Sequence, residues 1–167
     1  MHRFAALAAL SLALLSSSPS FAQMITISPE QVGGVFCIAR LGNDMAPVEG
    51  LLTAELKSAI ADAEAKNDAI QKAEPGDKPP LGDGIPWQDA PDYAAECNVG
   101  GVTLNEDKAS VAIAYGFPDY PDANFTDSLE LKLVDDASIG APVWRIDNVS
   151  YASTGDLQTA LVSAFAN

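Results

Sequence analysis

Hydrophobic positions recur at helical spacing in the first half of the chain and alternate in the second half. Ser28, Pro29 and Gln31 form a helix start: a cap residue, a proline at the first helical position and a side chain that reaches back to the cap. We therefore expect a helix from Ser28 to Gly42. Its apolar face consists of Val32, Val35, Phe36 and Ala39.

Two adjacent glycines, Gly33 and Gly34, lie inside this predicted helix. Each costs about 1 kcal/mol relative to alanine in a helix interior. Either another element approaches the helix closely at this point, or the helix is weaker than its apolar pattern indicates.

A second helical stretch is predicted from about Asp44 to Ala73, with a break near residues 47–50. Its later part has an apolar stripe that we expect to face the core: Leu52, Leu56, Ile60 and Ala63. The segment 74–86 contains four prolines and three glycines, a composition typical of a loop.

From Val99 onward the period changes to two, which predicts strands. Segments 102–104 and 111–115 flank the polar run 105–108, a composition typical of a hairpin turn. In segment 128–133, leucines alternate with polar residues, which predicts a strand with one solvated face.

The alternation slips by one residue in the last predicted strand. Trp144 and Ile146 share one face, yet the next apolar residues are Val149 and Tyr151. One extra residue at 147–148, a β-bulge, would return all four side chains to one face and bend the strand. Such bent strands form a curved sheet with a concave side.

These elements predict an α+β fold, with N-terminal helices packed on a curved antiparallel sheet and a short C-terminal helix. Residues 153–156 cap that last helix, whose inward residues are Leu157, Leu161 and Phe165. We expect residues 23–167 to form a single domain, because a chain of this length suits one core.

Residues 1–22 have the three parts of a secretory signal peptide: a positive start, an apolar run over 4–15, and a small polar stretch ending at Ala22. The apolar run is shorter than the roughly 20 residues that a membrane-spanning helix needs. We therefore expect a periplasmic or secreted protein without membrane insertion after the signal is cleaved.

The formal net charge of −14 disfavours nucleic acid and anionic membrane surfaces as partners, because both require clustered basic residues. The single histidine, His2, lies in the predicted leader, which excludes Ser-His-Asp and Cys-His catalysis and histidine-bound zinc in the remaining chain. We expect no cofactor and no metal, and we assign no catalytic residue.

Two cysteines follow the leader, Cys37 and Cys97. An even pair in an oxidising compartment is most simply a disulfide. A reactive thiol would need an activating base or a CxxC spacing, and neither is present.

The candidate ligand contacts are aromatic and polar residues of the loop exit and the strands. Trp87, Gln88 and Asp89 are either a core anchor with a turn cap or the mouth of a pocket. Arg145 and Asp147 are expected to form an ion pair on the sheet surface; alternatively, the bulge directs Asp147 inward as a base. Tyr115 and Tyr151 complete the set.

Four segments carry a resemblance to a known family: Ser28-Pro29-Glu30, residues 51–56, Trp87-Gln88-Asp89 and residues 144–151. They resemble a family of exported bacterial domains of unknown function, which is similar to the cystatin-like cone fold of nuclear transport factor 2. The resemblance implies a curved antiparallel sheet wrapped by N-terminal helices. It implies no activity.

We therefore predict a non-catalytic exported module that binds a small ligand or a protein partner with the concave face of its sheet. One alternative is an isomerase or hydrolase with Asp147 or Asp89 as general base. Another is an immunity or inhibitor protein whose acidic surface covers a basic secreted toxin or hydrolase.

Overall fold

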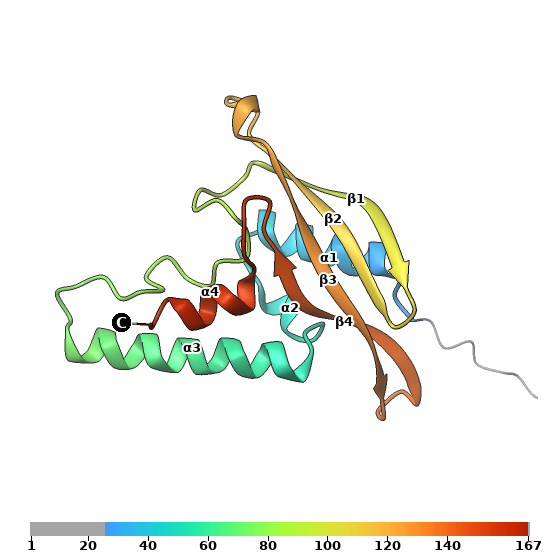
Figure 1. Cartoon of the computed structure of the whole chain (residues 1–167), viewed down its shortest axis with the longest axis horizontal. Coiled ribbons are helices and arrows are strands. Elements are labelled where there is room, and N and C mark those ends of the chain that lie inside the picture. The colour runs from blue at the N-terminus through green and yellow to red at the C-terminus, as the bar shows by residue number, and fades with distance from the viewer. Residues whose placement is uncertain (1–25, 167) are drawn as a thin grey trace, which may run out of the picture.

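The computed structural model describes residues 26–166, which form helices and one four-stranded antiparallel sheet (Figure 1). This confirms the α+β class and the short C-terminal helix. The predicted signal peptide, residues 1–22, lies outside the described residues. Within residues 26–166, no helix is long and apolar enough to cross a membrane.

The first helix, α1 (Pro29–Leu41), begins as the sequence predicts. The Ser28 Oγ accepts a hydrogen bond from the Gln31 backbone at 3.3 Å, and the Gln31 Oε1 accepts one from the Ser28 backbone at 2.8 Å. This reciprocal capping satisfies two backbone donors that the first turn would otherwise leave open.

The second predicted helical stretch consists of α2 (Ala46–Glu49) and α3 (Ala54–Ala73). Residues 51–53 separate them by pairing with the last strand: Thr53 N donates to Ile146 O at 2.8 Å, and Ile146 N donates to Leu51 O at 2.7 Å. The helix break therefore gives the outer edge of that strand a hydrogen-bonding partner.

The sheet has the order β1 (Glu96–Asn105), β2 (Lys108–Gly116), β3 (Phe125–Asp136) and β4 (Ala141–Ser150), with the 3-10 helix η1 (Pro121–Ala123) between β2 and β3. The β1–β2 hairpin confirms the predicted turn, because residues 106 and 107 connect the last paired residues of the two strands.

The predicted bulge in β4 is confirmed. Leu131 pairs with Ile146 and Glu130 pairs with Asn148, so Asp147 is the extra residue. A second bulge lies in β1, where Gly100 and Gly101 interrupt the pairing with β2; the sequence pattern did not indicate it.

Helix α1 covers one face of the sheet, and the core lies between them (Figure 1). Gly33 allows this packing, because a Cβ there would lie 3.0 Å from the Val111 Cγ1. Gly34 faces open space. A disulfide joins Cys37 of α1 to Cys97 of β1, as predicted.

Helix α4 (Leu157–Ser163) begins at Asp156, whose side chain accepts a hydrogen bond from the Thr159 backbone. It lies beside α3, next to the long loop that leads from α3 to the sheet (Figure 1). The buried residues Leu157 and Leu161 join the same hydrophobic core as α1 and the strands. This arrangement places α4 and the loop on either side of a cleft.

Candidate functional site

The loop between α3 and β1 spans residues 74–95 and is fixed to the sheet at its second half. The Tyr151 hydroxyl donates to Pro86 O at 2.6 Å, and Asp89 N donates to Asp127 Oδ2 at 3.1 Å. The Asp89 carboxylate accepts hydrogen bonds from the Ser153 backbone at 2.8 Å and its hydroxyl at 2.7 Å. These contacts give an irregular segment a defined position.

Asp127 is the buried acceptor at the centre of these contacts. It continues the core-facing alternation of Leu129 and Leu131 on β3 and is 1% exposed. Its carboxylate accepts hydrogen bonds from the backbone of Asp89 and of Ala152. Burial raises the pKa of Asp127 above its ordinary value, although the two backbone hydrogen bonds oppose that shift. The group serves as an anchor inside the fold.

Gln88 folds the next part of the loop into a turn. Its Nε2 donates to Ala90 O at 3.0 Å and to Asp92 O at 2.6 Å, and its Oε1 accepts from Arg40 Nη2 at 2.5 Å. The side chain is buried, and both of its polar atoms have partners. Gln88 therefore connects the loop to the last turn of α1.

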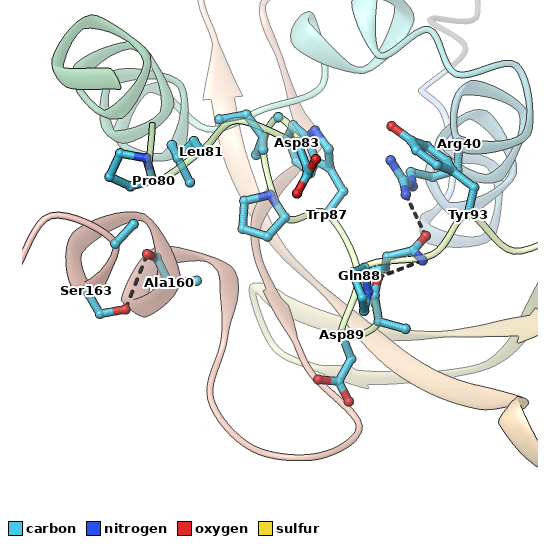
Figure 2. A pocket seen from close by; sticks show the side chains of 16 residues that line it. Arg40, Pro80, Leu81, Asp83, Trp87, Gln88, Asp89, Tyr93, Ala160 and Ser163 are labelled. Atoms are coloured by element: carbon cyan, nitrogen blue, oxygen red, sulfur yellow. Dashed lines mark hydrogen bonds between the residues drawn. The ribbon is translucent and has the colours of Figure 1, made fainter. Parts of the chain in front are cut away.

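A cleft of about 540 Å³ lies between this loop, Arg40 of α1 and the outer side of α4. We call it the loop cleft. Figure 2 shows Leu81 and Ala160 on one side of it and Arg40 and Tyr93 on the other. The apolar part of its lining comes mostly from the loop: Leu81, Ile85, Pro86, Trp87 and Pro91.

Two of the predicted ligand contacts are mainly core residues. Trp87 is 7% exposed and meets the Phe36 ring edge-on, with centroids 6.2 Å apart. Tyr115 is 2% exposed and stacks on Phe125 at 4.8 Å. Trp87 nevertheless lines the loop cleft, whereas Tyr115 does not.

The buried Tyr115 and the half-buried Tyr151 stay neutral over the whole physiological pH range. Burial, and after it the charge of Asp127, raises the pKa of both Tyr115 and Tyr151 well above the ordinary value. The nearby Arg40 guanidinium opposes this shift at Tyr115. The Tyr115 hydroxyl lies near this guanidinium, but no group within residues 26–166 makes a hydrogen bond of good geometry to it.

The predicted Arg145–Asp147 ion pair is wrong. Arg145 Nη2 lies 2.8 Å from Asp136 Oδ2, and Asp147 Oδ2 lies 2.8 Å from Lys132 Nζ. Because Asp147 is the bulge residue, its side chain leaves the register of Arg145 and also accepts a hydrogen bond from the Thr53 hydroxyl at 3.1 Å. Neither Arg145 nor Asp147 lines the loop cleft.

The structure thus brings Trp87, Gln88 and Asp89 together in the lining of the loop cleft and adds Arg40, which sequence reasoning missed. Tyr151 does not line the cleft and reaches the loop through its hydrogen bond to Pro86. A signal was present: Arg40 follows Phe36 by four residues and so falls on the apolar face of α1. A charged residue in such a phase needs a specific partner or a specific purpose.

No family model, curated protein or solved structure matches the chain. In the part of the chain that the structure describes, no three side chains of the His, Cys, Asp and Glu types form a potential metal site. Geometry and charge therefore carry the functional argument.

Proposed function

We propose that the protein is an exported, non-catalytic binding module that takes a small ligand, or a short segment of a partner, in the loop cleft. The observation that carries this proposal is a cleft of about 540 Å³ whose lining combines apolar side chains with an almost equal share of polar surface. Ligand sites in proteins have this size range, and they combine apolar surface with polar groups that fix the orientation of the ligand.

The anchoring of the loop supports a binding role. Gln88 is hydrogen-bonded to α1, Pro86 and Asp89 are hydrogen-bonded to the segment between β4 and α4, and Asp89 is also hydrogen-bonded to β3. A wall that is already ordered loses little conformational entropy when a ligand binds, which favours affinity. This site differs from the one predicted from the sequence, which was the concave face of the sheet. In the structure, α1 packs against one face of the sheet, and the cleft lies beside the loop and α4.

The contacts of the two candidate bases favour binding over acid–base catalysis. Asp147 is ion-paired with Lys132 away from the cleft, and both carboxylate oxygens of Asp89 accept hydrogen bonds from Ser153. A general base must reach the proton that it abstracts, and these carboxylates are directed to internal partners.

The disulfide supports export, because such bonds persist in oxidising compartments. We propose in addition that the helices and sheet are a version of the cystatin-like cone implied by the sequence resemblance. The antiparallel sheet with a bulge in β4 and a helix on one face supports this finer assignment.

The test is a titration of the isotope-labelled protein with a set of small organic fragments of positive, neutral and negative charge, followed by amide NMR shifts. We expect saturable shifts in residues 80–93 and 160–164, which border the cleft. Ser163→Phe should abolish them, because Ser163 is exposed and lines the cleft, so the larger ring fills the binding space.

Val162→Phe is the matched control, because this neighbouring α4 residue is 72% exposed and does not line the cleft. Its shifts should equal those of the wild type. The proposal is overturned if no fragment moves the cleft amides, or if Ser163→Phe leaves the shifts unchanged.

A further inference from the structure

Among residues 26–166, Arg40 is the one basic side chain that lines the loop cleft, and it is 9% exposed. It lies in the last turn of α1, one helical turn after Phe36. Burial of a cation costs several kcal/mol unless hydrogen bonds and an opposite charge compensate it. The partners of Arg40 therefore decide what the cleft can accept.

Those partners are few. A guanidinium has five N–H donors. In the described part of the chain, the only side chain that accepts a hydrogen bond from Arg40 is Gln88, whose Oε1 accepts from Nη2. No group in residues 26–166 makes a hydrogen bond of good geometry to the buried Nε, although the Tyr115 hydroxyl lies near the guanidinium. No carboxylate of that range lies within 4.0 Å of the guanidinium.

Weaker contacts stabilise the cation in part, and one of them is the nearby hydroxyl of the neutral Tyr115, which brings no negative charge. The Tyr93 ring lies 5.0 Å from the guanidinium carbon, a cation–π distance, and the carboxyl end of α1 carries partial negative charge. None of these contacts supplies the paired acceptor oxygens that a guanidinium fork prefers.

The acidic side chains that line the cleft interact with partners other than Arg40. Asp83 forms an ion pair with Lys78 Nζ at 2.5 Å, and Asp89 accepts both hydrogen bonds from Ser153. Within the described part of the chain, Arg40 is thus the charged group of the cleft that has no opposite charge beside it.

Resting on the proposed function, we infer that the ligand of the loop cleft carries a carboxylate, which pairs with Arg40, on an apolar body. The apolar body packs against the loop side chains Leu81, Ile85 and Pro86. This assigns to Arg40 the role of the specificity-determining residue and to Gln88 the role of fixing its orientation.

The experiment compares two probes of nearly equal shape, hexanoate and hexanamide, by NMR titration of residues 23–167, the chain expected after removal of the signal peptide. We expect hexanoate to bind the cleft at least about tenfold more tightly, the strength of a hydrogen bond to a charged group. Arg40→Gln should remove this preference. Lys108→Gln, which removes a positive charge from the exposed hairpin, should keep it.

Equal affinities for the two probes in the wild type overturn the inference while leaving the proposed function intact, because the cleft still binds. A preference that persists in a folded Arg40→Gln protein also overturns it. If that variant does not fold, the wild-type comparison of the two probes decides. Absence of binding by any fragment overturns both proposals.

Discussion

The two adjacent glycines of α1 allow a matched test of how closely the helix approaches the sheet. Replacing either glycine with alanine should gain about 1 kcal/mol of helix propensity. Gly34→Ala keeps this whole gain, because nothing lies within 4 Å of the added Cβ. We expect it to raise the free energy of unfolding by about 1 kcal/mol.

Gly33→Ala adds the same methyl group against the sheet. The Cβ would lie 3.0 Å from the Val111 Cγ1 and 3.3 Å from both methyl carbons of Val99. Val111 is fully buried in β2, so its side chain has little room to move. Overpacking of this kind costs about 1–3 kcal/mol, which equals or exceeds the gain in propensity. The net effect should lie between neutral and about 2 kcal/mol destabilising.

Urea unfolding followed by circular dichroism measures both variants against the wild type, with unchanged slopes as the sign that only stability changed. The decisive quantity is the difference between the two alanine variants, which we expect to be about 1–3 kcal/mol in favour of Gly34→Ala. If Gly33→Ala stabilises as much as Gly34→Ala, the packing of α1 on the sheet described above is refuted.

Three further predictions concern stability. Replacing both Cys37 and Cys97 with alanine removes a cross-link between residues 60 positions apart, so the unfolded chain gains conformational entropy. The free energy of unfolding should fall by about 4 kcal/mol, and an unchanged urea midpoint would contradict this. Because the pKa of Asp127 is higher in the folded than in the unfolded state, the folded protein loses stability as pH rises above about 4 and this carboxyl group ionises. Asp127→Asn cannot ionise, so its free energy of unfolding relative to the wild type should increase with pH in urea titrations. Asp156→Ala removes the cap of α4 and should lower the free energy of unfolding by about 1 kcal/mol in thermal unfolding. An unchanged free energy of unfolding would show that Asp156 does not stabilise the helix.

Local patterns predicted the elements because local physics determines them. The capping residues Ser28 and Gln31 interact within one helical turn, so their spacing alone indicates the helix start. The β4 bulge was predictable because a phase slip between Ile146 and Val149 has one economical explanation in a sheet with a buried face.

The candidate site was less predictable because its contacts join residues far apart in the chain. Asp89 meets Ser153 across 64 positions, and Arg40 meets Gln88 across 48. Alternation placed Arg145 and Asp147 side by side, but the bulge changed the direction of Asp147 and left Arg145 nearer to Asp136. Sequence spacing does not reveal which of several nearby charges a long side chain selects.

The bulge at Gly100 and Gly101 lies on β1, the strand at one edge of the sheet, while residues 51–53 occupy the opposite edge beside β4. An irregular edge is a poor template for a second flat strand, so the fold discourages fibril growth between copies. Regularising it by deleting one of the two glycines would expose a continuous ladder of backbone groups, and the risk of amyloid formation would increase with it.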